Sequence, residues 1–464
     1  MKKSHFIFIL LCLFISIELF AGIRLPAVIS SNMVLQQQSK ATLWGWGDPG
    51  DRIKVITSWN NAIDSVAVTS DGTWSIKVPT PSAGGPYTIT LRGWRTGVLE
   101  NILIGEVCVC SGQSNMEWSS WNNNKQINDE MPKSQNNNIR FFHIPRGTSN
   151  YPQDDCDARW EVCGPETLKG FSAVGYFFGK KLNQDMNVPI GLIEAAWGGT
   201  PAEVWTPSDV IAGDTVMKEA AGKLPVTPWG PSRPGKTYNA MIAPITNFDI
   251  AGTIWYQGEA NVGINSTYQK TFTSMIGAWR NAWHKNFPFY YVQIAPFAYG
   301  GKTEGARLME QQTRSLSYSN TGMVVITDLV ENVNDIHPQN KYDVAQRLAN
   351  LALGQTYQRS VGLYKSPAFR NMEINKNKVT LFFDNAPNGF LVRGPKATEF
   401  FISGEDKNFV PADVKVEKDR IVVSSKLVAA PVAVRFSFTN TGMSNVFSKE
   451  GLPVTPFRTD NWED

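Results

Sequence analysis

The stretch GEVCVCSGQSNMEW, residues 105–118, decides the fold of the chain. The apolar residues of 102–109 predict a buried strand, which breaks at a Ser/Gly turn and is followed by a helix. A strand end of this kind lies where ligands bind, so it would expose Ser114 as a nucleophile. The stretch departs from the Gly-x-Ser-x-Gly elbow because Met116 replaces the second glycine. A serine at a turn more often only shapes the turn, so the prediction needs a base, an oxyanion hole and a suitable compartment.

Residues 101–362 alternate apolar strands with helical patterns. Continuous apolar runs, which are typical of strands covered on both faces, lie at 188–196, 252–257, 289–295 and 323–327. Apolar residues recur at helical spacing from Tyr268 to Trp283 and from Tyr342 to Ala352. The pattern predicts an α/β domain with a mainly parallel sheet in three layers. Polar and glycine residues follow the strand ends, where such sheets bind ligands: Ser114, Gly198, Gly199, Gly258, Asn261 and Asp328.

Two β-rich modules flank this domain. Residues 22–100 contain short alternating runs separated by Gly, Pro and Asp turns, a pattern that predicts a small β-sandwich. Residues 363–464 return to such runs and predict a β-rich C-terminal module of ordinary domain size. A module of this type either binds sugar or braces its neighbour, and the 15 tryptophans of the chain suit both a sugar-binding surface and a core.

The N-terminus predicts export. In residues 1–21, Lys2 and Lys3 precede the apolar run 6–17, and Ala21 offers a small-residue cleavage site. The predicted product is a periplasmic or secreted protein that has no membrane partner after signal cleavage; a retained anchor is the alternative, because it would use the same run. The net charge of +3, without a basic run, gives no reason to propose a nucleic-acid partner. Nothing in the sequence indicates an oligomeric state.

Four cysteines remain once the predicted signal is removed. Cys108 and Cys110 are two apart on one strand, so they point to the same face and are poorly placed to bond each other. Cys156 and Cys163 flank a short segment that an exported protein closes readily with a disulfide. The spacings lack a Cys-x2-Cys knuckle, so we predict no metal site.

A serine hydroxyl needs a base with a pKa near neutrality, usually an imidazole. Three of the four histidines are set aside, because they lie in the predicted signal, in a predicted strand and at a helix end: His5, His143 and His284. His337 remains, in a loop that leads from the strand at 323–327 to the next helix. A carboxylate then orients the ring. Asp335, in the same loop, is the first candidate and Asp328 is the reserve.

An acyl-transfer enzyme also needs donors for the developing oxyanion. The sequence offers the backbone N–H of Ser114, a backbone N–H within residues 197–200, and the side-chain amide of Asn261. Glycines at 198–199 would let the backbone approach a substrate closely. The alternatives are a plain turn at the glycines and a helix cap at Asn261.

Four motifs together resemble the sialate O-acetylesterases of the SGNH-type hydrolases: GQSNM at 112–116, AWGGTP at 196–201, WYQGEAN at 255–261 and DIHP at 335–338. The resemblance covers nearly the whole mature chain and implies an SGNH-hydrolase-like domain. It implies that Ser114 is the nucleophile, His337 the base and Asp335 its partner. SGNH hydrolases usually place the acid three residues before the histidine, a position that Asn334 occupies here, so the identity of the acid stays open.

The resemblance also extends the candidate site. It implies that Ser114, Gly199 and Asn261 form the oxyanion hole, and the same motifs supply the candidate substrate-binding residues Gln113, Gln257 and Glu259. The expected function is that of an exported esterase that removes O-acetyl groups from sialic acids through an acetyl-enzyme, with no cofactor. The runner-up is an esterase of acetylated xylan or another plant glycan, and a different class is a non-catalytic glycan-binding protein. Three arginines are candidates for pairing a sialate carboxylate or for ordinary ion pairs: Arg140, Arg146 and Arg307.

Overall fold

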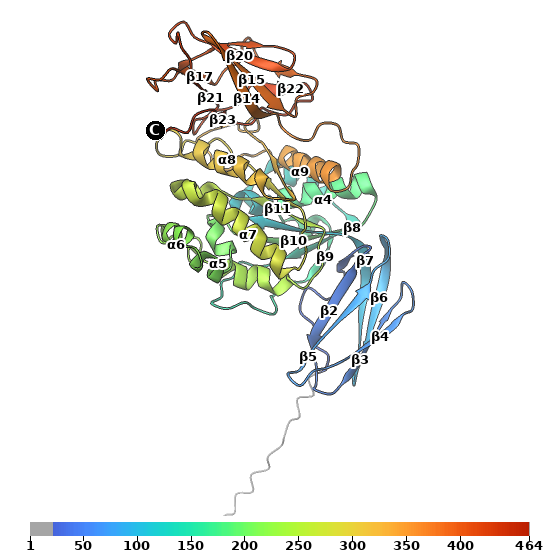
Figure 1. Ribbon diagram of the computed structural model, residues 1–464. Helices are drawn as coiled ribbons and strands as arrows, with labels where there is room; N and C mark the ends of the chain where they lie inside the picture. Colours follow the sequence, from blue (N-terminus) through green and yellow to red (C-terminus); the bar gives the residue numbers. More distant parts are fainter. Residues whose placement is uncertain (1–21, 464) are drawn as a thin grey trace, which may run out of the picture.

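The structure is a computed structural model that describes residues 22–463; the predicted signal at 1–21 lies outside the described residues. A central α/β domain carries one β-rich module near the N-terminal end and another near the C-terminal end (Figure 1). This arrangement confirms the predicted fold class. In the described residues no helix has both the length and the apolar character needed to cross a membrane.

The long strand β7 (Thr96–Gly112) joins the N-terminal module to the central sheet. Its first half pairs with β6 (Gly84–Arg92) and β1 (Val34–Gln36), which belong to the module. Its second half pairs in parallel with β10 (Ile190–Ala196) and β11 (Gly252–Tyr256). The predicted domain boundary between residues 100 and 101 therefore falls inside one continuous strand. Module and domain also share one hydrophobic core.

The central sheet is parallel except at one edge, as predicted. Its strand order is β13-β12-β11-β7-β10-β8-β9, and only β9 runs antiparallel to its neighbour. The strands not yet placed are β8 (Asn136–His143), β9 (Trp160–Cys163), β12 (Phe289–Val292) and β13 (Thr321–Val324). The apolar run predicted as the last strand extends to residue 327. Pairing nevertheless stops at Val324, and Val325 and Ile326 are buried without a ladder.

Helices cover both faces of this sheet and make the predicted three layers. On one face lie α4 (Ala173–Met186) and α9 (Lys341–Gln355), and on the other α7 (Tyr268–Ala282) and α8 (Glu304–Arg314) (Figure 1). The alternation along β7 matches these layers. Cys108 and Cys110 point into the core below α4 and α9, whereas Val107 and Val109 point into the opposite core. The strand is apolar throughout because both of its faces are covered.

The N-terminal module is a two-layer sandwich, as predicted. One layer pairs β2 (Lys40–Trp46) with β5 (Thr73–Pro79), and the other contains β3 (Arg52–Thr57), β4 (Ile63–Ala67), β6 and the first half of β7. The C-terminal module has its own core. Its strands are β14 (Ala368–Asn375), β15 (Lys378–Asp384), β16 (Phe390–Val392), β17 (Phe400–Ser403), β18 (Val410–Pro411), β19 (Asp413–Val416), β20 (Arg420–Ser424), β21 (Ala433–Phe436), β22 (Val446–Ser448) and β23 (Phe457–Arg458).

Polar contacts attach the C-terminal module to α8. Arg458 of β23 binds Glu310 of α8 with two hydrogen bonds, of 3.0 and 2.9 Å. Such a two-bond arginine–carboxylate pair fixes orientation as well as distance. The side chain of Asn440 accepts the N–H of Gly305, at the start of the same helix. The module therefore rests on the helical layer, away from the N-terminal sandwich (Figure 1).

All four cysteines in the described chain are free thiols, including Cys156 and Cys163. The Cys163 thiol is buried and donates to the carbonyl of Ser134 at 3.1 Å. Burial raises the pKa of the Cys156 thiol and that of the Cys163 thiol to about 12. Within residues 22–463 no group of three His, Cys, Asp or Glu side chains gathers closely enough to hold a metal ion.

Gly105 tests how tightly β7 is held at the junction of the two domains. A Cβ at this position would collide with the carbonyl oxygen of Pro189, whereas a Cβ at Gly97, in the same strand, would meet nothing within 4 Å. We expect Gly105→Ala to destabilise the protein by about 2 kcal/mol, because the backbone on both sides must shift. Gly97→Ala is the control and should leave the thermal unfolding midpoint unchanged. Equal midpoints for the two variants would contradict the close approach.

Candidate active site

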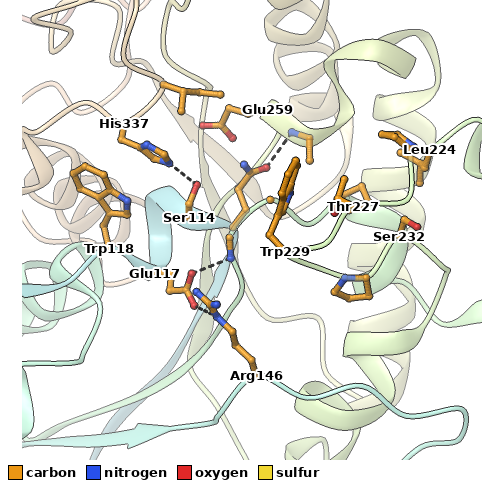
Figure 2. A pocket seen from close by; sticks show the side chains of 18 of the residues that line it. Ser114, Glu117, Trp118, Arg146, Leu224, Thr227, Trp229, Ser232, Glu259 and His337 are labelled. Atoms are coloured by element: carbon orange, nitrogen blue, oxygen red, sulfur yellow. Dashed lines mark hydrogen bonds and ion pairs between the residues drawn. The ribbon is translucent and has the colours of Figure 1, made fainter. Parts of the chain in front are cut away.

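A cavity of about 620 Å³ opens beyond the carboxyl ends of β7, β10 and β11 (Figure 2). Ligands of open α/β sheets bind at this edge, where the chain crosses from one side of the first strand to the other. The segments that follow the three strands supply one wall. A loop spanning residues 224–232 supplies the opposite wall, and the sequence prediction did not include it.

A tight strand end places Ser114 in this cavity. Gly112 has φ +141°, a conformation that side chains rarely adopt, and a Cβ there would collide with the carbonyl oxygen of Tyr256. The next residue, Gln113, donates its backbone N–H to the same carbonyl at 3.0 Å. Ser114 then begins the one-turn helix α1 (Ser114–Glu117). Only a glycine lets the backbone turn so close to β11, so the SGQS sequence determines where the hydroxyl points.

The structure brings Ser114 and His337 together, although they are 223 residues apart in the sequence. Nε2 of His337 lies 2.9 Å from Oγ of Ser114. The imidazole stacks on the indole of Trp118, with ring centroids 4.7 Å apart and planes inclined by 21°. Trp118 follows α1 directly, so the segment that carries the serine also supports the imidazole (Figure 2).

Burial and charge both act on His337. Burial lowers the pKa of its imidazole, the charge of Lys341 lowers it further, and Asp335 opposes them. Burial away from water and a nearby cation both raise the free energy of the protonated ring, and a nearby anion lowers it. The ring is therefore neutral at neutral pH and can accept a proton through Nε2.

The two candidate acids lie in different surroundings. Asp335 accepts the backbone N–H of His337 at 2.9 Å, and the same oxygen is 3.7 Å from Nδ1 of the ring, which is beyond hydrogen-bonding distance. Its side chain is 45% exposed. Asp328 is instead buried and bound by Arg347 through two bonds of 2.7 Å. The structure thus places Asp335 beside His337 and Asp328 in a separate ion pair.

The backbone N–H groups of Ser114 and of Gly199, which both line the cavity, donate no hydrogen bond within the described chain. The Gly198–Gly199 turn is held by Glu117, whose Oε2 accepts the N–H of Gly198 at 2.9 Å. Gly199 has φ +73°, and its missing Cβ leaves the space that the indole of Trp229 occupies. A carbonyl oxygen in the cavity would find both N–H groups available.

Asn261 and Gln257 lie behind the cavity wall. Both are fully buried, and neither lines the cavity. The Asn261 amide donates to Glu203 at 2.8 Å, and its oxygen accepts the N–H of Ala202 at 2.9 Å and the Gln257 amide at 2.8 Å. The amide group predicted to hold an oxyanion therefore stands outside the cavity lining, and one of its two N–H donors is bound to Glu203. Asn261 instead anchors the segment just after the Gly198–Gly199 turn.

Gln113 and Glu259 do line the cavity. The side-chain oxygen of Gln113 accepts the N–H groups of Gly258 and Ala260, at 3.3 and 3.2 Å, and so joins the serine turn to the loop after β11. Glu259 accepts the amide of Asn115 at 2.7 Å through one oxygen, and its other oxygen, Oε2, is buried without a partner. Burial raises the pKa of Glu259, and Lys341 opposes that shift.

Sequence reasoning missed the opposite wall and part of the near one. Trp229 is 61% exposed and stands across the cavity from Trp118 (Figure 2). The signal was present, because the segment LPVTPWGP at 224–231 combines three prolines with a tryptophan in a loop. Glu117, directly after the motif at 112–116, also had no predicted role. Of the three arginines, only Arg146 lines the cavity, and its Nε donates to Glu117 at 2.5 Å.

Comparison with known proteins identifies the family of the chain. The family model described as carbohydrate esterase, sialic acid-specific acetylesterase matches residues 105–357. The sialate O-acetylesterases of Homo sapiens and Pongo abelii are each 28% identical to the chain over 400 residues, covering 77% of this chain and 75% of theirs. The crystal structure of a carbohydrate acetylesterase from Xanthomonas citri superposes with a TM-score of 0.87 at 34% identity, covering 95% of this chain and all of that one. The chain belongs to the sialic acid-specific acetylesterase family of carbohydrate esterases.

Proposed function

We propose that this esterase of acetylated sugars removes O-acetyl groups from sialic acids or similar sugars, through an acetyl-enzyme formed on Ser114. The observation that carries the proposal is the 2.9 Å contact between Oγ of Ser114 and Nε2 of His337, two residues that line the cavity. A nucleophile and its base need to be within hydrogen-bonding reach of each other, and a neutral imidazole is the form that accepts the proton.

In the first half of the reaction Oγ of Ser114 attacks the acetyl carbonyl carbon while Nε2 of His337 takes the hydroxyl proton. The C–O bond to the sugar then breaks, and His337 returns that proton to the departing sugar oxygen. In the second half a water molecule gives a proton to His337 and attacks the acetyl-enzyme. Acetate leaves, and His337 returns the proton to Ser114.

The oxyanion hole that we propose consists of two backbone groups, the N–H of Ser114 and the N–H of Gly199. Both residues line the cavity, and neither N–H has a partner within the described chain. Preorganised donors stabilise the oxyanion because they need no rearrangement when charge develops. Asn261 would act indirectly, since its hydrogen bond to Ala202 holds the segment that carries Gly199.

Two features of the cavity suit a sugar that carries an acidic group. The exposed ring of Trp229 offers a flat apolar surface to a sugar. Arg146 is the cation of the cavity lining, and its Nε is the atom that donates a hydrogen bond within the described chain. Its remaining nitrogens match the geometry of a carboxylate. The names of the curated relatives support sialic acid esters as the substrate. The predicted signal supports export from the cytoplasm.

Replacing Ser114 tests the nucleophile. We expect Ser114→Ala to lower kcat for a soluble acetyl ester by about 10⁴-fold, because no other hydroxyl within residues 22–463 hydrogen-bonds to the imidazole. Ser111→Ala is the matched control: this serine lies three residues earlier, at the end of β7, and its hydroxyl donates to the carbonyl of Ala195 at 2.6 Å. Its turnover should stay near wild type. Residual activity in Ser114→Ala close to wild type would remove Ser114 from the mechanism.

The pH dependence tests His337. Because burial and Lys341 lower the pKa of His337, the acid limb of kcat/KM should lie below about pH 6.5, the usual histidine value.

Replacing each aspartate separates its effects on rate and on stability. Asp335→Asn should lower kcat by only about tenfold, because its carboxylate is half exposed and beyond hydrogen-bonding distance of Nδ1. Asp335 raises the pKa of His337, so its removal should also move the acid limb to lower pH. Asp328→Asn should leave kcat near wild type but cost about 3 kcal/mol of stability, because Arg347, whose side chain is 13% exposed, then loses its ion-pair partner. A large loss of kcat in Asp328→Asn with unchanged stability would reverse the assignment.

Arg146 tests the choice of sugar. If Arg146 binds the carboxylate of a sialic acid, Arg146→Met should raise KM for O-acetylated sialic acid about tenfold. Cleavage of acetylated xylan should stay as before, because its acetylated xylose units have no carboxylate. Arg159→Met is the control, because this arginine is 83% exposed and pairs only with Glu161 in the described chain. Acetate release measured on both substrates decides the question. Equal losses on both sugars would show that Arg146 acts only through Glu117 and the Gly198 turn.

A further inference from the structure

A lysine is fully buried beside the proposed catalytic pair. Lys341 begins α9, directly after the loop that carries His337, and has no exposed surface. Its Nζ donates to the side-chain oxygen of Asn115 at 2.6 Å. The ammonium also lies over two aromatic rings, 5.0 Å from the centroid of Trp118 and 5.5 Å from that of Tyr256. Lysines are seldom buried to this extent, because a charge without water is costly unless it is paired.

Asn115, the partner of Lys341, is the residue next to Ser114 and is itself buried. Its amide nitrogen donates to Glu259 at 2.7 Å and to the carbonyl of Ile336 at 3.1 Å. One side chain thus connects three segments of the site: the turn that carries Ser114, the residue before His337, and the loop after β11. Lys341 holds this side chain in place from the fourth segment, the start of α9.

The charges in this network can be followed one by one. His337 faces Lys341, which disfavours its protonation, and Asp335, which favours it. Lys341 in turn faces Glu259 and Asp335, both of which stabilise the ammonium against burial. Burial is nevertheless the largest effect on Lys341 and lowers its pKa to about 7. The ammonium is therefore charged at mildly acidic pH, the range in which His337 would otherwise take up a proton.

We propose that Lys341 is a positioning residue of this esterase: through Asn115 it holds the Ser114 turn against the His337 loop, and its buried charge keeps the imidazole free to accept the serine proton. The inference rests on the proposed roles of Ser114 and His337. It assigns a purpose to a buried lysine that does not line the cavity and that no step of the reaction uses directly. Geometry and charge are two separable parts of this role.

The charge is tested by Lys341→Met, which keeps the length of the side chain but removes the ammonium. We expect the acid limb of kcat/KM to move up by about one pH unit, because a nearby cation no longer opposes protonation of His337. Leaving Glu259 without its counter-charge acts in the same direction. The pKa of His337 can also be followed without turnover, by NMR of the imidazole; the chain has four histidines, and His337→Gln assigns the signal. Lys341→Arg keeps the charge and should keep the acid limb.

The geometry is tested by Asn115→Ala, which cuts the links to Glu259, to Ile336 and to Nζ of Lys341 but keeps the lysine side chain itself. We expect kcat to fall about tenfold with KM changed less than about twofold, because misplacing Ser114 relative to His337 affects the reaction more than binding. The acid limb should stay nearer to wild type than in Lys341→Met. Lys415→Met, in the C-terminal module and 77% exposed, is the control for losing a lysine.

The outcomes separate this inference from the proposed function. An unchanged His337 pKa in Lys341→Met, together with unchanged kcat in Asn115→Ala, would overturn the role of Lys341. If Lys341→Met does not fold, two other results would overturn the role of Lys341. One is an acid limb of kcat/KM that shifts to higher pH in Lys341→Arg, and the other is a wild-type kcat in Asn115→Ala. Activity retained by Ser114→Ala would overturn the proposed function, whereas a raised His337 pKa in Lys341→Met would still support the charge effect.

Discussion

The parallel pairing of β7 with β10 and β11 is the constraint on which the rest of the structure depends. It aligns three strand ends at one edge of the sheet, so that the segments after them meet around one cavity. The pairing also commits β7 to burial on both faces, which requires an apolar sequence and two helical layers. Because the first half of the same strand belongs to the sandwich, the N-terminal module cannot move independently of the site.

The site combines groups that are exposed to the cavity with side chains that bind one another and the backbone around it. Ser114, His337 and Gly199 line the cavity. Side-chain amides and carboxylates bind the segments that carry them: Gln113, Asn115, Glu117, Gln257 and Asn261. Buried polar groups are costly unless they are bonded, so this second set is rigid and holds the first set in place.

How far the sequence predicted the site can be seen from individual residues. The position of Ser114 followed from a local pattern, an apolar strand that breaks at a Ser/Gly turn, and local patterns survive in the fold. Asn261 and Gln257 lie in a motif as clear as that of Ser114, but the direction of their side chains depends on Glu203, Thr200 and Ala202. Trp229 reaches the cavity only because its loop folds back over Gly199. A motif identifies a segment, whereas packing decides which way each side chain points.

The sequence by itself determined the order of the domains, the parallel sheet and the pairing of a serine with one remaining histidine, because each of these is encoded in periodicity, turns and residue type. Only the tertiary structure decided which carboxylate lies beside His337 and which N–H groups near Ser114 have no partner in the described chain. It also decided that Lys341 is buried beside the site. The contacts responsible join residues 223 and 226 positions apart, between Ser114 and His337 and between Asn115 and Lys341. Separations of that length leave no local pattern, since they arise only when β7 and α9 pack on the same sheet.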